Sequence, residues 1–212
     1  MRTTNILILV CVAMSLFAWT ADPVTVERNL VFSLQNIQEG RAWVLFTALF
    51  VHASPIHLFG NMIFLYVFGN TLERVSGPRR MLFMFFLGGI LSFLLGLPFF
   101  HPDATFVGAS AAIFTLTAVV MLMEPLKFSI LFLMPVGLVA ILYFLYNALA
   151  VYYSIESGVA YVSHIIGFVL GIPFGVAWAP QWKRNLLISI GLLAAYLSLL
   201  FFIEEHVLPA LG

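Results

Sequence analysis

Four polar residues of this chain have types and spacings that could support catalysis: His57, Asn61, Ser110 and His164. A serine beside a histidine is a nucleophilic pair, in which the imidazole removes the proton of the hydroxyl group. His57 and Asn61 are four residues apart, so on a helix their side chains share one face. Two donors on one face could stabilise an oxyanion, the charge that forms when a serine attacks a carbonyl group.

The composition indicates where these residues lie. The 212 residues are 63% hydrophobic and 8% charged, whereas soluble domains are about half apolar and about a quarter charged. This composition excludes a water-soluble globule and predicts an all-α integral membrane protein, with about 20 apolar residues in each span. Nine basic and nine acidic residues cancel, so no excess of basic charge is available for binding nucleic acid. Polar groups within a bilayer are costly, which makes each of the four a functional candidate.

Seven apolar segments are delimited by charged residues, prolines and glycines. They cover about residues 6–20, 56–72, 81–97, 110–123, 128–153, 160–178 and 186–203. When the N-terminus is placed inside, seven of the nine basic residues fall on the inner side and only Arg28 and Arg41 on the outer side. This bias follows the positive-inside rule, so we predict seven spans with the N-terminus inside and the C-terminus outside.

The first 55 residues contain the first apolar segment and a longer, mixed stretch after it. The stretch 21–55 is too long for a tight turn, and we expect it to form short helices at the outer surface. The first apolar segment could alternatively be a cleaved signal peptide, because Arg2, a short apolar run and small residues near Ala18 and Ala21 fit that pattern.

Ser110 is expected at the start of a helix that lies below the outer surface. A helix from Ser110 to Met123 is about 20 Å long at 1.5 Å per residue, against a hydrocarbon core of about 30 Å. Glu124 marks its inner end, so the backbone from Phe106 to Ala109 must descend into the membrane without being helical. Such backbone is tolerated where it is buried in protein or lines a wet cavity. The free N–H groups of the helix start would favour an anion there.

His164 lies about one turn inside the sixth apolar segment, at a similar depth. It is followed by Gly167, Gly171 and Gly175, and small residues at this spacing let another helix backbone approach closely. The fourth segment is itself lined by alanines next to Ser110, so we expect the two helices to touch. The imidazole of His164 would then come within reach of the Ser110 hydroxyl.

Alternative roles for the polar residues fit less well. Polar side chains in bundles often only hydrogen-bond neighbouring helices, and we favour this interpretation for His52. A metal or haem site would need more ligands than the histidines supply, because the chain has a single cysteine and no mid-membrane carboxylate. A retinal-type receptor needs a lysine deep in a helix, and a proton-coupled transporter usually carries buried acids. The lysines and acids fall at the ends of the spans instead: Lys127, Lys183, Glu73, Glu124 and Glu156.

In order, spacing and placement on the spans, these residues resemble the rhomboid intramembrane serine proteases over about residues 43–175. The resemblance rests on Thr47–Met62 with His52, His57 and Asn61, on Phe68-Gly69 with Leu72-Glu73, on Gly108-Ala109-Ser110, and on Ser163-His164 with Gly167 and Gly171. Three positions depart from the family pattern. Ala111 stands where a glycine is usual, Phe114 where many members have a tyrosine that packs against the base, and Val44 where an arginine follows Trp43.

The resemblance implies a role for each residue. Ser110 would be the nucleophile and His164 the general base, while His57, Asn61 and the Ser110 N–H would form the oxyanion hole. His52 and Glu73 would be structural. The implied fold is a rhomboid-like six-helix core over residues 1–180, including the outer loop 21–55, with an appended seventh helix and tail over 181–212. The first segment belongs to that core, which argues against its cleavage.

The predicted function is a serine endopeptidase of the cell membrane that cleaves transmembrane segments of membrane proteins without a metal or cofactor. Because Asp22 and Asp103 lie in loops, no aspartate is available to orient His164, and a Ser-His dyad is expected. The loop Tyr153–Ala160 could cap the site, and the fifth span, with Pro135 and Gly137, could move to admit substrate. The alternative is a catalytically silent relative that binds membrane-protein clients. Such proteins typically lose the serine or the histidine, and this chain keeps both.

Overall fold

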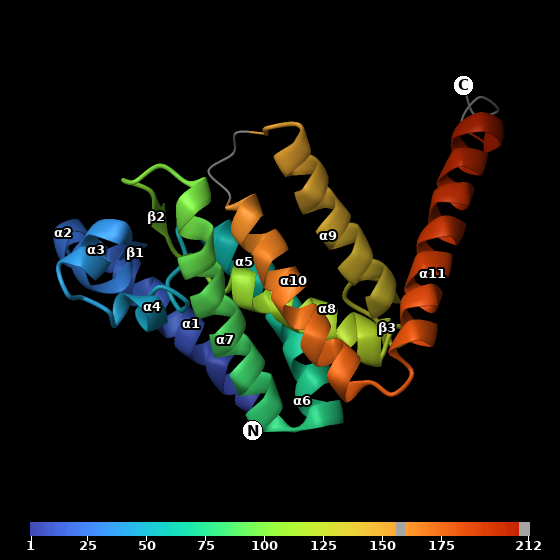
Figure 1. The fold of residues 1–212 in the computed structure, drawn as a ribbon, viewed down its shortest axis with the longest axis horizontal. Helices are drawn as coiled ribbons and strands as arrows, with labels where there is room; N and C mark the ends of the chain where they lie inside the picture. The colour runs from blue at the N-terminus through green and yellow to red at the C-terminus, as the bar shows by residue number, and fades with distance from the viewer. Residues whose placement is uncertain (156–159, 208–212) are drawn as a thin grey trace.

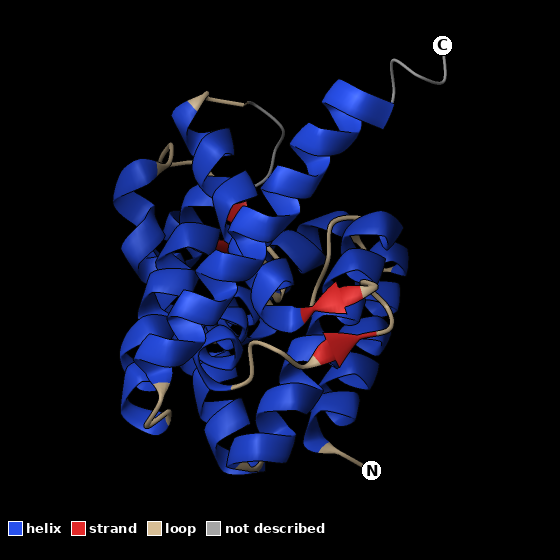
Figure 2. Ribbon diagram, turned by 90° about the vertical axis from the view of Figure 1, so that its right-hand side faces the viewer, coloured by secondary structure: helices blue, strands red, loops and turns tan. Residues whose placement is uncertain are grey.

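The computed structural model describes residues 1–155 and 160–207, most of which are helical (Figures 1 and 2). The α-helices are α1 (Thr3–Thr20), α2 (Pro23–Leu30), α3 (Leu34–Gln38), α4 (Val44–Thr47), α5 (Pro55–Phe64), α6 (Asn70–Ser76), α7 (Pro78–Gly96), α8 (Ser110–Met123), α9 (Val136–Tyr152), α10 (Tyr161–Trp178) and α11 (Trp182–Phe202). In the part of the chain that the structure describes, four two-residue strands form two antiparallel pairs, which are β1 (Phe32–Ser33) with β2 (Thr105–Phe106) and β3 (Phe128–Ser129) with β4 (Met134–Pro135).

The chain is a polytopic helical membrane protein. Within the described residues, four helical stretches are long and apolar enough to cross a membrane: Thr3–Thr20, Pro78–Phe99, Tyr161–Trp178 and Trp182–His206. The apolar helices α8 and α9 are shorter, with 14 and 17 residues. A further helical stretch runs through α5, one π-helical turn (Leu65–Gly69) and α6 without a break.

The helix boundaries agree with the sequence in most places and differ in one. The expected helix over 110–123 is α8, and the expected short helices of 21–55 are α2, α3 and α4. The expected helix over 128–153 is wrong in its first part, since residues 128–135 form the β3–β4 hairpin and α9 begins at Val136. Pro135 is extended, with ψ of 139°, and the Val136 N–H donates to the Lys127 carbonyl at 2.8 Å, which closes the hairpin before the helix starts.

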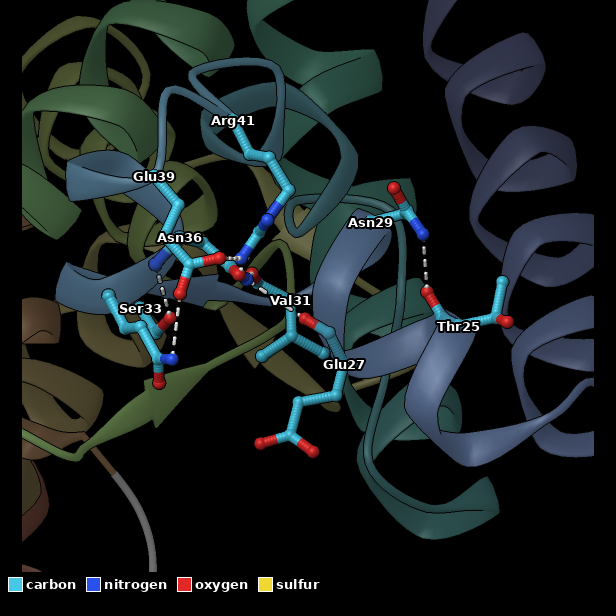
Figure 3. A network of polar contacts seen from close by, with 9 residues as sticks. Thr25, Glu27, Asn29, Val31, Ser33, Asn36, Glu39 and Arg41 are labelled. Atoms are coloured by element: carbon cyan, nitrogen blue, oxygen red, sulfur yellow. Dashed lines mark hydrogen bonds and ion pairs between the residues drawn. The ribbon is translucent and has the colours of Figure 1, made fainter.

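The stretch 21–55 is organised around one buried amide (Figure 3). Asn36 Nδ2 donates to the carbonyl oxygens of Glu27 and Val31, both at 2.8 Å. Asn36 Oδ1 accepts from Arg41 Nε at 3.0 Å, and Arg41 also forms an ion pair with Glu39. Because these partners lie in α2, directly after α2 and beyond α3, the amide fixes the path of the chain between them and holds α2 and α3 together.

The β1–β2 pair ties this stretch to the segment that leads into α8. Phe32 pairs with Phe106, and the Phe32 ring stacks on Phe93 of α7 with centroids 5.0 Å apart. The pairing joins residues more than 70 positions apart in the sequence. It therefore fixes the backbone just before Ser110 from outside the bundle.

Helices α8 and α10 lie in close backbone contact, as the glycine spacing predicted. A Cβ atom added at Gly167 would lie 2.3 Å from the Ala111 carbonyl oxygen, and one at Gly171 would lie 2.4 Å from the Thr115 carbonyl oxygen. Thr115 Oγ1 also donates to the Gly167 carbonyl at 2.8 Å, which links the two helices directly. This approach sets the distance between Ser110 on α8 and His164 on α10.

Helix α11 lies at the edge of the bundle and leans away from it along its length (Figure 1). Only 6% of its most apolar 18 residues are buried inside the structure, against 39% for α10. Its attachment is polar, because Asn185 Nδ2 donates to the carbonyl oxygens of Leu122 and Met123 at 2.7 and 3.2 Å. These are free carbonyls at the C-terminal end of α8, so α11 caps that helix.

Candidate active site

Ser110 is the first residue of α8, and the backbone before it is not helical, as predicted for Phe106 to Ala109. Gly108 has φ of +116°, a value that L side chains rarely adopt. A Cβ atom there would also lie 2.9 Å from Cε1 of His57. Gly108 is thus required both by its own conformation and by the histidine that packs on it. No side chain forms a capping hydrogen bond at the start of α8. The first backbone N–H groups of this helix, which lie beside Ser110, can therefore donate to a bound group.

Ser110 and His164 lie together. His164 is in the first turn of α10, and its Nε2 is 2.8 Å from Ser110 Oγ. The imidazole is 6% exposed, while Ser110 is half-buried. A hydroxyl at this distance from an imidazole nitrogen can transfer its proton directly.

The second nitrogen of His164 contacts a residue that sequence reasoning missed. His164 Nδ1 is 2.7 Å from Oδ1 of Asn147, which lies on α9 and is 1% exposed. Aspartate is the usual residue type for this contact, and an asparagine takes its place here. The signal was present in the sequence, because Asn147 is the one asparagine in the apolar run 136–152 and polar groups in such runs are functional candidates.

Phe114 holds the face of the imidazole. Its ring is stacked on His164 with centroids 4.7 Å apart and an interplanar angle of 12°. The opposite face of Phe114 stacks on Tyr143 of α9 at 4.2 Å. The contact expected from the usual tyrosine is therefore made by phenylalanine, and three stacked rings leave the imidazole little freedom to rotate.

His52 joins three segments around the site. Its Nδ1 is 3.1 Å from Ser15 Oγ of α1, and its Nε2 accepts the Ala109 N–H at 3.4 Å. Its backbone carbonyl accepts from Trp19 Nε1 at 2.8 Å. These bonds support the structural interpretation, since they anchor the residue just before Ser110 to α1.

His57 and Asn61 lie on α5, one turn apart. The His57 ring packs edge-on against His52, with centroids 5.1 Å apart, and touches Gly108. Asn61 is 6% exposed, and within the described residues its amide has no hydrogen-bond partner. Its amide atoms are not among the fully enclosed polar atoms that lack a partner, so the amide keeps some exposed surface and can donate to a group bound there.

Glu73 contacts the start of α1. Its Oε1 accepts the Thr3 N–H, and its Oε2 accepts the N–H and the hydroxyl of Thr4, at 2.7–2.8 Å. Three donors from the first turn of α1 therefore end on one carboxylate of α6. Glu73 joins these two helices and caps the start of α1, which is a supporting role.

Within residues 1–155 and 160–207, no three His, Cys, Asp or Glu side chains are grouped so that they could hold a metal ion. The loop expected to cap the site, Tyr153–Ala160, includes residues 156–159, which lie outside the described residues.

Comparison with known proteins agrees with the resemblance seen in the sequence. The profile of the Rhomboid domain matches residues 39–181, about two thirds of the chain. The Bacillus subtilis protein YdcA, provisionally named a rhomboid protease, is 34% identical over 122 residues, which are 57% of this chain and 61% of that protein. Rhomboid-like protease 1 of Toxoplasma gondii is 34% identical over 83 residues, covering 39% of this chain and 28% of that protein.

A plant relative, the mitochondrial RHOMBOID-like protein 12 of Arabidopsis thaliana, is 37% identical over 62 residues, covering 29% of this chain and 18% of that protein. The matched segments thus span less than two thirds of the length of these relatives.

Proposed function

Because the chain belongs to the rhomboid family, we propose that it is an intramembrane serine endopeptidase that cleaves transmembrane segments of membrane proteins. The observation that carries this proposal is the 2.8 Å contact between Ser110 Oγ and His164 Nε2, two residues 54 positions apart on different helices. A second support is that the His164 imidazole stacks on Phe114 and that its other ring nitrogen, Nδ1, contacts Asn147 Oδ1. A silent, client-binding relative would have no need for this arrangement.

In the proposed mechanism, His164 Nε2 takes the Ser110 proton while Ser110 Oγ attacks the scissile carbonyl carbon. The tetrahedral intermediate collapses to an acyl-enzyme as His164 returns the proton to the leaving amine, and water then releases the acyl group by the same steps in reverse. The negative charge of the intermediate is stabilised by His57, the Asn61 amide and the Ser110 N–H. The uncapped start of α8 and the unpartnered Asn61 amide support this assignment.

The proposed topology has seven spans, with the N-terminus inside and the C-terminus outside, in the cell membrane. The ends of the chain support it, since the start of α1 and the end of α11 lie at opposite ends of the molecule in Figure 1. Residues 1–180 form the catalytic core in this proposal, and 181–212 form an appended helix and tail. The low burial of α11 supports that division.

The substrate is a single transmembrane helix that unwinds near its upper end and enters beside α9. Gly137, near the start of α9, is tightly packed, because a Cβ atom there would lie 2.7 Å from Ser189 Oγ and 2.8 Å from Pro125 Cβ. The other end of α9 has exposed side chains at Tyr146, Leu149 and Tyr152. For substrate entry, α9 therefore pivots near Gly137, and its opposite end, which lies close to Ser110, moves outward.

The test is cleavage of a model transmembrane substrate by purified protein in detergent. Wild type should cut the substrate, and Ser110→Ala and His164→Ala should both fail to cut it while remaining folded. Equal cleavage by wild type and Ser110→Ala would end the protease proposal. Binding of the substrate by wild type without any cleavage would favour the client-binding alternative.

A further inference from the structure

Asn147 is the contact of His164 that the proposed mechanism does not yet use. It lies in the C-terminal part of α9, is 1% exposed and stands among apolar and aromatic residues. Its Oδ1 is 2.7 Å from His164 Nδ1, and its Nδ2 donates to the Tyr143 carbonyl at 2.8 Å. Burying an amide in an apolar helix is costly, so both of its polar ends have partners here.

The bond to Tyr143 determines which end of the amide faces the histidine. If the amide were reversed, its oxygen would face the Tyr143 carbonyl oxygen, and two acceptors would oppose each other. The NH2 group must therefore point to Tyr143 and the oxygen to His164. An amide oxygen only accepts, so His164 Nδ1 must carry the proton.

This choice of tautomer fixes the state of the other ring nitrogen. A neutral imidazole has one protonated nitrogen, so with the proton on Nδ1 the lone pair is on Nε2, which lies 2.8 Å from Ser110 Oγ. Only this tautomer can accept the serine proton. In well-studied serine proteases, the wrong tautomer alone lowers turnover by about four orders of magnitude.

We propose that Asn147 is a positioning residue that holds His164 in the tautomer and orientation needed to accept the Ser110 proton, so that the site is a Ser110–His164–Asn147 triad rather than a dyad. This inference rests on the proposed function. An amide differs from the usual aspartate because it carries no charge, so it orients the ring without strongly favouring the protonated imidazole. A neutral orienting group also avoids the burial of a carboxylate inside an apolar helix.

The simpler alternative is that Asn147 merely links α9 to α10. Asn185 provides a matched control, because it is also a buried asparagine that links two helices, through the Leu122 carbonyl, and it does not contact His164. If only helix packing mattered, Asn147→Ala and Asn185→Ala would have similar effects.

The first measurement needs no turnover. Nitrogen-15 NMR of histidine-labelled protein, with the His164 signals assigned by their loss in His164→Ala, reports which ring nitrogen is protonated. Wild type and Asn185→Ala should show the proton on Nδ1, and Asn147→Ala should show a mixture of tautomers. The same tautomer in all three proteins would overturn the proposal, whether or not the protein is a protease.

The second measurement uses the cleavage assay. Asn147→Ala should lower kcat by about 100-fold with little change in KM, and Asn185→Ala should not, at equal loss of thermal stability. Asn147→Asp restores an acceptor for His164 Nδ1 and should recover part of the activity that Asn147→Ala loses, because its second oxygen can no longer donate to the Tyr143 carbonyl. The acid limb of its pH–rate profile should move to higher pH, because a carboxylate favours the protonated, inactive imidazole.

The outcomes separate the two proposals. Wild type that cleaves while Asn147→Ala retains full kcat would overturn the triad and leave the protease intact. Wild type that does not cleave would contradict the proposed function, and the tautomer experiment would still decide whether Asn147 orients His164. An unmoved pH profile in an active Asn147→Asp protein would count against the triad.

Discussion

At the scale of single residues, the site is defined by how one imidazole is held. Each ring nitrogen of His164 has a partner, Ser110 from α8 and Asn147 from α9. The face of the ring is covered by Phe114, which also belongs to α8. A side chain with three such contacts loses most of its rotational freedom when the protein folds. The reaction then requires no reorientation of the base, which is how preorganised sites lower a barrier.

Asn61 gives a prediction at this scale. Asn61→Ala should lower turnover by about 10–1000-fold, because its amide is proposed to donate to the oxyanion and has no partner in the resting site. Cleavage kinetics with the model substrate measure this effect. Asn70 on the following helix serves as control, since its amide donates to Asn5 and to the Tyr66 carbonyl. Unchanged turnover in Asn61→Ala would remove this residue from the oxyanion hole.

Most of the candidate residues could be predicted from the sequence, but the contact of Asn147 with His164 could not. Ser110, His164, His57 and Asn61 stand out because each is polar within an apolar segment and their spacing places them at one depth. Asn147 satisfies the first condition too. Its face on α9 depends on how α9 rotates against α10, which the nearly uniform apolar pattern of 136–152 does not encode.

At the scale of elements, the site depends on how closely two helices approach. Gly167 and Gly171 allow the backbone of α10 to touch the carbonyl oxygens of α8, and these contacts begin one turn from His164. Because helices are stiff, a change in the spacing of α8 and α10 would be transmitted directly to the distance between Ser110 and His164.

Gly167→Ala tests this dependence. The added methyl group would lie 2.3 Å from the Ala111 carbonyl oxygen, so α10 must move away from α8. Such overpacking costs about 1–3 kcal/mol, and we expect a lower midpoint of thermal unfolding together with a loss of cleavage activity. Gly191→Ala on α11 is the control, because nothing lies within 4 Å of its added Cβ atom. Wild-type stability and activity in Gly167→Ala would show that the close approach is not needed.

The elements themselves were predictable to different degrees. The bounds of α8 follow from Ser110 at one end and Glu124 at the other, and they agree with the structure. The β3–β4 hairpin was missed because residues 128–135 are almost all apolar, and composition alone does not separate an apolar hairpin from a helix. The β1–β2 pair was missed because each strand has two residues and the partners are far apart in the sequence.

At the scale of the whole molecule, the outer segment and the helical bundle act together. The stretch 21–55 is fixed internally by Asn36 and attached to the segment before Ser110 by β1–β2 and by His52. At the opposite end, Glu73 fastens the start of α1 to α6. The candidate site therefore depends on contacts along the full depth of the bundle.

The orientation in the membrane can be tested with single cysteines. The native Cys11 is fully buried in α1 and gives little background labelling. With a membrane-impermeant maleimide added to intact cells, cysteines at His101 and Glu204, both exposed, should be labelled, and a cysteine at Lys183 should be labelled only after lysis. Labelling of Lys183→Cys in intact cells would contradict the proposed orientation.

The most direct test of the central claim is to locate the bond formed by a fluorophosphonate probe, which reacts with serines activated by a base. Purified protein in detergent is treated with the probe, digested and analysed by mass spectrometry. We predict one adduct, on Ser110, that is absent in Ser110→Ala and strongly reduced in His164→Ala. An unlabelled Ser110 in folded wild type, or equal labelling in His164→Ala, would contradict the claim that His164 activates Ser110.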